Sequence, residues 1–392
     1  MPDRRRPTRV VIASRIFAPE ISAASGILRT WAEEFRDRGA EVRILTAKPP
    51  RGAVIDDPPG IDIRRAPVKR DKQLYVRGYL SYLSFDIPLA FRMLFSRRAD
   101  LYIVEPPPTT VAVVRVIGAL RRTPYVVRAA DYWSEAAELV TRNPLILRAL
   151  RWVEAWGLNG AKVLFAAHAP LIERFRLAGI VSRAVPIGFG ADTKDFRYEG
   201  QPPPDPPVFI YAGTHSEWHG AGIFVDAMPQ VVARYPAARL EYYGNGEERE
   251  SMLARAHELG LEESVEFNAP IPPSALAPVL SGATASVASL TPVPANDYAL
   301  ATKVYSSLAA GCPVIFAGRG PTVALLNGAA HPGAGVAVEY DVDAVAAAMN
   351  AAAAAPVRPA VRSQLAQWSA GEFSLTTIAQ RVVDECLASI GA

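Results

Sequence analysis

The feature that most constrains the fold is a repeated alternation of short apolar strand patterns with amphipathic helix patterns. Residues 10–13 (VVIA) read as a buried strand, residues 27–38 as an amphipathic helix that ends at Gly39, and residues 42–46 as the next strand. Strands that alternate with helices are typical of parallel sheets, because each crossover connection needs a helix. The first half continues with strand patterns at 101–104, 125–127 and 163–165.

A segment without apolar periodicity interrupts this alternation. Residues 188–207 (GFGADTKDFRYEGQPPPDPP) combine glycines, charges and a proline cluster, as linkers do. Strand patterns then resume at 208–211, 240–243, 265–267, 285–288, 314–316 and 335–338. We therefore expect an α/β fold of two doubly wound Rossmann-like domains that face each other across a cleft. The expected boundaries are 1–190 for the N-terminal domain, 191–207 for the linker and 208–375 for the C-terminal domain.

The composition indicates a soluble globular protein. Half of the 392 residues are hydrophobic, and the net charge of +3 argues weakly against a dedicated nucleic-acid binder. Cys312 and Cys386 match no metal or disulfide spacing, which fits a reducing compartment. The basic N-terminus lacks the apolar core of a secretory signal, and no window reaches the roughly 18 apolar residues of a membrane span. We expect a cytoplasmic location, or peripheral attachment to the inner face of the cell membrane.

One stretch bears on membrane attachment. Residues 73–98 interleave aromatic residues and leucines with arginines. Such a pattern could lie on an anionic membrane, although core packing under a basic solvent-exposed face explains it equally well.

A solitary lysine stands out in the stretch ALATKVYSSLAAGCPVIFAGRG (299–320). Thr302 is a candidate N-cap, so Lys303 would lie in the first turn of a helix with an apolar face. The helix dipole disfavours a cation there unless an anion binds to it. The pattern thus favours an anion site, and a surface lysine that extends away from the apolar face is the alternative.

Small residues follow two strands of the second half. Gly213, Thr214 and His215 follow the first of these strands, and Gly244, Asn245 and Gly246 lie between a strand and a helix. Such loops let backbone N–H groups face a phosphate, but any tight turn between a strand and a helix also favours glycine and asparagine.

Carboxylates follow strands of the first half. Asp131 lies at the carboxyl edge of the predicted sheet, where it could orient a hydroxyl nucleophile or act as a base, or merely cap the helix that carries Trp133. Glu20 and Glu105 lie on loops at the same edge and are either acceptor contacts or solvated. The histidines are isolated, so we expect no metal site.

Four motifs together resemble one enzyme family. FAPEISAAS is similar to its Pro-Pro-Glu-Ile-Gly-Gly loop, and DYW (131–133) to its Asp-Leu-Trp. GADTKDF (190–196) resembles its Gly-Val-Asp-x-x-x-Phe, and TKVYSSLAAGCPVI resembles Ser-Lys-x-x-Glu-x-Leu-Ala-Ala-Gly-Lys-Pro-Val-Ile. The chain thus resembles, over nearly its whole length, the GT-B retaining glycosyltransferases of family 4.

The resemblance implies roles for these residues. Asp131 and Lys303 would be catalytic, with Lys303 on the donor diphosphate, and the last helix (376–392) would pack back on the N-terminal domain. Acceptor-side contacts would come from Glu20, Ser22, Ala23, Glu105 and Trp133, with Ser22 and Ala23 near the donor phosphates. Donor-binding residues would be Gly213, Thr214, His215, His219, Gly244, Asn245, Gly246, Pro270, Asp297, Tyr298, Thr302, Lys303 and Ser306.

The sequence also departs from the family pattern. Tyr298 and Ser306 stand where the family has two glutamates, one for the sugar and one for the ribose, and Asp297 could replace the first. His219 occupies the place of a family lysine.

The resemblance therefore implies transfer of a hexosyl unit from a UDP- or GDP-sugar to a hydroxyl of a saccharide, lipid-linked or small-molecule acceptor, with retention and without metal or cofactor. A non-catalytic nucleotide-sugar-binding or partner protein is one alternative, motivated by the lost glutamates. A nucleotide-sugar epimerase is the other.

Overall fold

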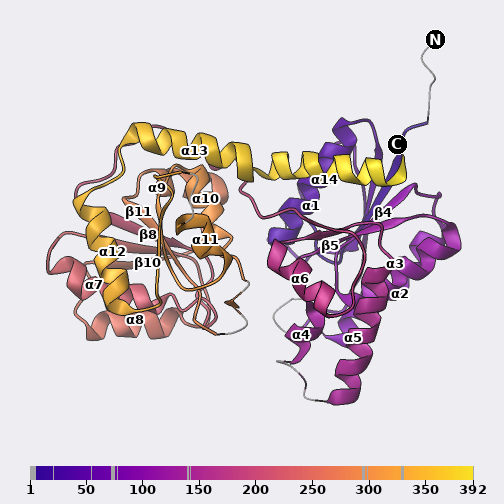
Figure 1. Cartoon of the computed structure of the whole chain (residues 1–392), viewed down its shortest axis with the longest axis horizontal. Coiled ribbons are helices and arrows are strands. Elements are labelled where there is room, and N and C mark those ends of the chain that lie inside the picture. The colour runs from indigo at the N-terminus through magenta and orange to yellow at the C-terminus, as the bar shows by residue number, and fades with distance from the viewer. Residues whose placement is uncertain are drawn as a thin grey trace, which may run out of the picture. The chain divides into compact units, whose positions relative to one another are not determined.

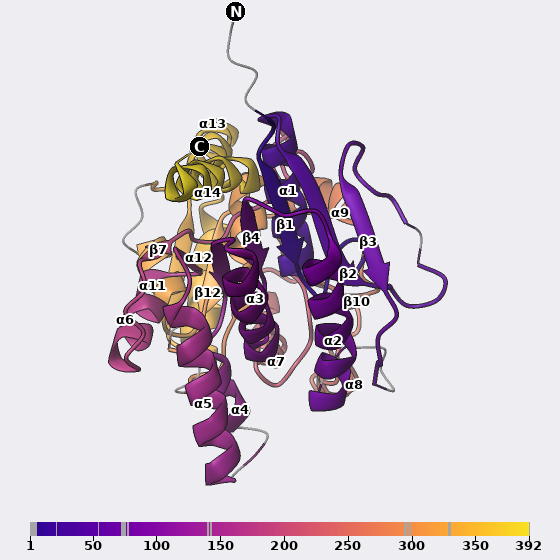
Figure 2. The same ribbon diagram turned by 90° about the vertical axis from the view of Figure 1, so that its right-hand side faces the viewer.

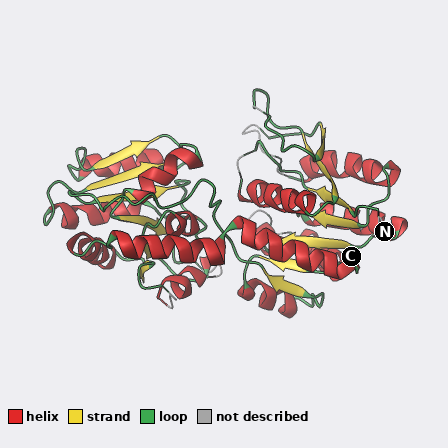
Figure 3. Ribbon diagram, turned by 90° about the horizontal axis from the view of Figure 1, so that it is seen from above, coloured by secondary structure: helices red, strands yellow, loops and turns green. Residues whose placement is uncertain are grey.

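The computed structural model describes residues 6–20, 22–53, 55–71, 76, 78–138, 141, 143–293, 296–297, 299–327 and 331–391. The chain divides into two compact units. The first comprises residues 1–188 and 376–392, and the second comprises residues 189–375. In each unit a parallel sheet lies between layers of helices (Figure 1, Figure 3).

The first unit is built on a seven-stranded sheet. Its strands are β1 (Arg9–Ala13), β2 (Glu41–Ala47), β3 (Asp62–Ala66), β4 (Leu101–Val104), β5 (Tyr125–Ala129), β6 (Leu164–Ala166) and β7 (Ala184–Pro186). Their order is β3-β2-β1-β4-β5-β6-β7, and all neighbours are parallel. The helices are α1 (Ala23–Asp37), α2 (Tyr79–Phe95), α3 (Pro108–Arg121), α4 (Trp133–Glu138), α5 (Pro144–Asn159), α6 (Ala169–Leu177) and α14 (Leu375–Ile390).

The second unit repeats this plan with six strands. They are β8 (Val208–Ala212), β9 (Arg239–Tyr243), β10 (Val265–Asn268), β11 (Ala285–Ser289), β12 (Val314–Ala317) and β13 (Gly335–Val338). Their order is β10-β9-β8-β11-β12-β13, again parallel throughout. The helices are α7 (Gly222–Val232), α8 (Arg249–Glu258), α9 (Pro273–Ser281), α10 (Lys303–Ala309), α11 (Pro321–Asn327), α12 (Val342–Ala354) and α13 (Pro359–Phe373).

Continuous apolar runs form the central strands because helices bury both faces of each sheet. On β8, Phe209 and Tyr211 pack with Phe224 of α7. Ile210, which lies between them, points to the opposite face and packs with Tyr305 of α10. In the first unit, Trp31 of α1 is fully buried and its ring meets Phe165 of β6 edge-on at 5.6 Å between centroids. These contacts hold each sheet rigidly between its helices.

Two strands of the first sheet were not predicted from the sequence. β3 (DIRRA) and β7 (AVP) form the two edges of the sheet. An edge strand pairs on one side only and remains partly exposed, so it needs no apolar run.

The order of the strands reverses once in each sheet, between β1 and β4 and between β8 and β11. The predicted fold class of two doubly wound parallel α/β domains is therefore confirmed. In such sheets, ligands bind at the carboxyl ends of the strands that flank the reversal. Ligand contacts are thus expected from the loops after β1, β4, β8 and β11.

The last helix, α14, belongs to the first unit. Arg38, just beyond α1, forms an ion pair with Asp384, and Arg183 binds Glu385 at 2.6 Å. None of the described helices combines the length and the hydrophobicity that a membrane span requires.

Candidate functional site

Lys303 begins α10 at the carboxyl edge of the second sheet. Its Nζ donates to the hydroxyl of Tyr211 at 2.5 Å and lies 3.8 Å from the centroid of that ring. A β-carbon on Gly213 would lie only 3.0 Å from Nζ, and Gly213 has a φ of +142°. The loop after β8 therefore needs glycine where it passes the lysine.

The charge of Lys303 has no acidic partner among the described residues. In the part of the chain that the structure describes, no carboxylate lies within ion-pair distance of its Nζ. Burial alone lowers the pKa of Lys303 to about 7. A buried cation without a counter-charge is costly, and such a group is a candidate for binding an anion.

Two histidines lie near this lysine. Burial, with the charge of Lys303 as the next cause, lowers the pKa of His215 and that of His219 to about 4, so both rings are neutral at pH 7. His215 is fully buried, and neither of its ring nitrogens has a hydrogen-bond partner among the described residues. His219 Nδ1 lies 2.7 Å from the Ser216 hydroxyl. The two histidines near the lysine therefore carry no charge of their own at pH 7.

The glycines of the second small-residue loop have a packing role. A β-carbon on Gly244 would lie 1.9 Å from the carbonyl oxygen of Gly213, and one on Gly246 would lie 2.1 Å from that of His215. His215 N donates to the carbonyl of Asn245 at 3.0 Å. The loops after β8 and β9 thus pack backbone to backbone, and this close approach by itself explains the Gly-Asn-Gly sequence.

The other predicted donor residues are less closely connected to Lys303. The backbone carbonyl of Thr214 accepts from the Tyr211 hydroxyl at 2.9 Å. Thr302 occupies the N-cap position of α10, but its hydroxyl makes no capping hydrogen bond, contrary to the prediction. Pro270 lies beyond the end of β10, Asp297 is exposed, and Ser306 lies within α10. Tyr298 lies outside the described residues.

The carboxyl edge of the first sheet holds paired charges. One nitrogen of Arg128 on β5 donates to both oxygens of Glu105, at 2.7 and 2.9 Å, and both side chains are largely buried. Glu20 accepts two hydrogen bonds from Arg70, at 2.8 and 2.9 Å. Both glutamates named by the sequence are thus held by arginines rather than solvated.

Asp131 follows β5 at the same edge. The residue as a whole is exposed, yet desolvation by the surrounding protein raises the pKa of its carboxyl group, and the charge of Arg128 opposes that rise. The alternative role as a helix cap does not hold, because Glu154 of α5 accepts the N–H groups of Trp133 and Ser134 at 2.9 and 2.8 Å. Asp131 is therefore left available to a ligand.

Ser22 has a structural role at the start of α1. Its hydroxyl accepts the N–H of Ser25 at 3.1 Å and so caps α1, which begins at Ala23. The ring of Trp133, by contrast, packs edge-on against the ring of Tyr82 of α2, with 6.3 Å between the two centroids.

Arg15, two residues beyond β1, was not singled out from the sequence. Its guanidinium lies 5.3 Å from the Tyr82 ring and 5.4 Å from the Trp133 ring. Tyr211 was missed likewise, because within an apolar strand it reads as an ordinary core residue. The sequence did contain a signal for Arg15, because a charged residue within two positions of the end of a buried strand lies at the carboxyl edge.

The stretch at 73–98 forms α2 from Tyr79 to Phe95, and residues 72–75 and 77 lie outside the described part. One face of α2 carries large exposed apolar side chains, spaced three or four residues apart and between 46% and 78% exposed. This α2 face consists of Leu80, Leu83, Ile87, Phe91 and Phe95.

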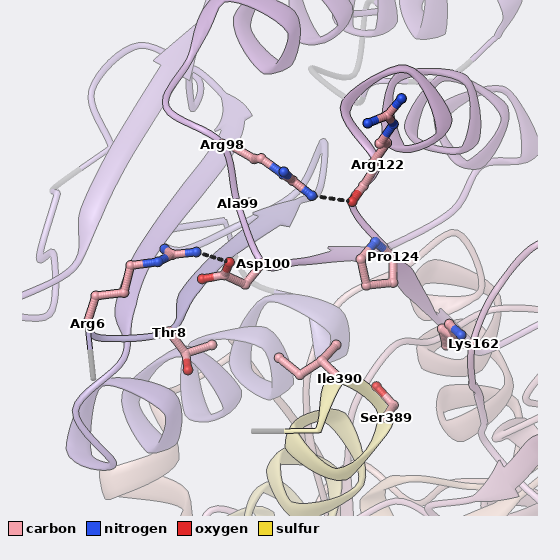
Figure 4. Close-up of a pocket in the computed structure, with 10 residues that line it drawn as sticks. All are labelled: Arg6, Thr8, Arg98, Ala99, Asp100, Arg122, Pro124, Lys162, Ser389 and Ile390. Atoms are coloured by element: carbon pink, nitrogen blue, oxygen red, sulfur yellow. Dashed lines mark hydrogen bonds and ion pairs between the residues drawn. The ribbon is translucent and has the colours of Figure 1, made fainter. Parts of the chain in front are cut away.

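A cavity of about 550 Å³ lies at the opposite, amino edge of the first sheet (Figure 4). Some of its charges are already engaged: Arg6 binds Asp100 at 2.6 Å, and Arg98 donates to the carbonyl of Arg122. Since ligands of such sheets bind at the carboxyl edge, the size of this cavity does not make it the functional site. Among the described residues, no group of three His, Cys, Asp or Glu side chains could hold a metal ion.

The chain has two doubly wound units, one of which carries at its carboxyl edge a partly buried lysine without a carboxylate partner among the described residues. This is the architecture of GT-B glycosyltransferases. A family model of the glycosyl transferase 4-like domain matches residues 25–190, and one of the group 1 glycosyl transferases matches residues 206–354. The chain belongs to the group 1 glycosyltransferases and is a transferase of glycosyl units. A search of curated proteins found no match to the sequence.

Solved structures share the fold over nearly the whole chain. Sucrose-phosphate synthase from Thermosynechococcus elongatus has 18% identity and a TM-score of 0.70, covering 96% of this chain and 98% of its own. HepE of Anabaena in complex with UDP has 16% identity and a TM-score of 0.69, and the match covers 97% of this chain and 100% of HepE. WaaG, a glycosyltransferase involved in lipopolysaccharide biosynthesis, has 14% identity and a TM-score of 0.65, and the match covers 96% of this chain and 99% of WaaG. At these identities the likeness shows the fold alone.

Proposed function

We propose that the chain transfers a hexosyl unit from a UDP- or GDP-sugar to a hydroxyl group of a saccharide, lipid-linked or small-molecule acceptor, with retention of the anomeric configuration. The observation that carries this proposal is the buried ammonium of Lys303, which has no carboxylate partner among the described residues. A leaving nucleoside diphosphate develops negative charge, and a cation held in a desolvated site stabilises it.

The neighbours of Lys303 support this role. Tyr211 fixes the direction of the amine through a 2.5 Å hydrogen bond. The unpartnered ring nitrogens of His215 offer a neutral donor to a phosphate oxygen. In this proposal Lys303 neutralises charge that a metal ion would otherwise neutralise, so we expect activity in the presence of EDTA.

UDP-sugars are the first donors to test. HepE, a structural neighbour, has been solved with UDP and with UDP-glucose. On the acceptor side, Asp131 would accept the proton or the hydrogen bond of the attacking hydroxyl, because its raised pKa brings it nearer to the range in which carboxylates act as bases.

The test is donor binding and turnover with UDP-glucose and a GDP-sugar. We expect release of nucleoside diphosphate to fall by about 10²- to 10³-fold in Lys303→Ala, and Lys194→Ala, an exposed lysine of the same unit, to match the wild type. Full activity of Lys303→Ala would refute its role. Binding without release of diphosphate with any acceptor would favour the binding protein, and conversion of the donor sugar to its epimer would favour the epimerase.

We propose in addition that the α2 face lies on an anionic membrane. The face is unpartnered in the described chain, and α2 packs through its other side against α3, beside which it lies in Figure 2. α3 adds Val116 and Leu120, both exposed. A single helix face with this much exposed apolar surface is typical of interfacial helices.

Charge next to the α2 face favours a lipid surface over a protein partner. A cavity of about 300 Å³ at the C-terminal end of α2 is lined by Arg43, Arg64, Arg92 and Phe95. Asp62 binds Arg43 and Arg64 at 2.7 and 2.6 Å, so one carboxylate faces three guanidinium groups. The surplus positive charge beside apolar side chains suits an anionic headgroup.

Vesicle sedimentation tests this contact. We expect binding to phosphatidylglycerol vesicles but not to phosphatidylcholine vesicles, and loss of binding in Phe91→Ser/Phe95→Ser. Leu177→Ser, which changes an exposed leucine of α6 instead, should bind like the wild type. Failure of the wild type to bind phosphatidylglycerol vesicles would refute the proposal. A wild-type dimer that becomes monomeric in the double variant would assign the face to self-association.

A further inference from the structure

Arg15 lies at the reversal point of the first sheet and forms no ion pair with the residues that the structure describes. It follows β1, and Glu105 follows β4, the two strands that flank the reversal. No carboxylate of the described residues lies within ion-pair distance of its guanidinium. Its Nε is buried without a hydrogen-bond partner, and one terminal nitrogen donates to the carbonyl of Val76 at 3.2 Å.

The carboxylates nearest to Arg15 are engaged elsewhere. Glu105, Glu20 and Asp86 all attract its charge. Glu105 binds Arg128, and Glu20 binds Arg70. Asp86 accepts from the Thr110 hydroxyl at 2.6 Å, and burial raises the pKa of its carboxyl group. Other arginines thus neutralise the two glutamates, and the Asp86 carboxyl group acts on Arg15 only from beyond ion-pair distance, so no carboxylate of the described residues binds Arg15 directly.

Aromatic rings hold the guanidinium in place. Tyr82 of α2 and Trp133 of α4 lie within 5.4 Å of it from two different elements. Rings of this kind orient an arginine without neutralising it, because the attraction is to the ring quadrupole. They also provide the flat apolar surface on which sugars stack. A guanidinium presented in this way is suited to a planar or tetrahedral oxyanion.

We propose that Arg15 recognises an anionic group, a carboxylate or a phosphate, on the acceptor saccharide. This inference rests on the proposed function, since it places the acceptor at the edge that carries Asp131. It narrows the acceptor to the class of uronic acids and sugar phosphates. Arg15, Tyr82 and Trp133 form the subsite, and Arg15 supplies its charge.

The test is a binding measurement that needs no turnover. Glucose, glucuronate and glucose 6-phosphate are titrated calorimetrically into the full chain saturated with UDP, which keeps anions away from Lys303. We expect at least one of the two anions to bind about tenfold or more tightly than glucose, a typical gain for a charge-assisted contact. The identity of the tighter anion distinguishes phosphate from carboxylate.

Variants separate recognition from folding. Arg15→Gln should bind the anion no better than glucose, Arg15→Lys should retain part of the preference, and Arg176→Gln, an exposed arginine of α6, should behave like the wild type. Equal affinity of the wild type for all three sugars would overturn the proposal. So would an equal loss of glucose and anion binding in Arg15→Gln, because that result would indicate a structural role. Failure of the proposed function would appear separately, as absence of nucleoside diphosphate release.

Discussion

The two carboxyl edges are built on the same topology but differ in how they treat charge. In the first unit, arginines and glutamates pair closely, as Arg128 does with Glu105 and Arg70 with Glu20. In the second unit, Lys303 is held by the Tyr211 ring and hydroxyl and faces two histidines that are neutral at pH 7. Topology therefore sets where the ligand-binding edges lie, while the pairing of charges sets what each edge can bind.

Each edge nevertheless has a cation that is packed on an aromatic ring and has no carboxylate partner in the described chain. In the first unit it is Arg15, beside Tyr82 and Trp133. In the second it is Lys303, on Tyr211. The difference lies in the side chain: the pKa of the lysine is lowered into the physiological range, whereas arginine stays protonated.

The largest effect is expected from breaking a buried pair. Arg128→Met should lower the free energy of unfolding by about 3–5 kcal/mol, because Glu105 would remain buried without its partner. Chemical denaturation measures the loss. Arg183→Met, which breaks the more exposed pair with Glu385, should cost less than about 1 kcal/mol. Equal losses of unfolding free energy in the two variants would show that burial does not increase the contribution of the Arg128–Glu105 pair to stability.

Asp131→Asn comes next. If Asp131 accepts the proton or hydrogen bond of the acceptor hydroxyl, the amide should lower the rate of transfer by about 10²-fold and leave UDP affinity unchanged. Steady-state kinetics with saturating donor separates the two quantities. Donor affinity that falls together with the rate would place Asp131 in donor binding instead.

A pH titration of UDP affinity tests the lysine itself. Lys303 is protonated below its pKa of about 7 and loses its charge above it, so affinity should fall by about tenfold between pH 7 and 8.5. His215 and His219, with pKa values of about 4, and Tyr211, whose pKa is raised, do not titrate in this window. Lys303→Arg should remove the dependence. The same slope in that variant would mean that another group titrates.

The sequence predicted the parts of the molecule that local pattern determines. Apolar runs located the central strands because both sheet faces are covered, and Lys303 stood out as a lone cation beside small residues. β3 and β7 were not predictable in this way, because an edge strand has no such run. Arg15 was equally hidden: the chain is rich in arginine, and only the fold places this one beside two aromatic rings at the carboxyl edge of the first sheet.

The last effect is a change in stability on replacing Lys303, and its dependence on pH distinguishes the two cations. The pKa of Lys303 falls from 10.5 in the unfolded chain to about 7 in the folded protein. Between these values the unfolded state binds more protons, so folding gains stability as pH rises from 7 to 10.5, and the buried charge destabilises the fold below pH 7. Lys303→Met should therefore raise the Tm of the second unit at pH 6, by about 2–4 °C for each kcal/mol recovered.

This gain should shrink as pH rises towards 9, because the wild-type lysine then discharges by itself. Arg15→Met should show no such trend, since arginine remains protonated across the range. Calorimetry at pH 6 and pH 9 on both variants and the wild type gives the comparison directly. If Lys303→Met is less stable than the wild type at both values, the lysine contributes packing rather than a charge held for a ligand. In that case the contrast between the two edges would lie only in the residues that surround the cation.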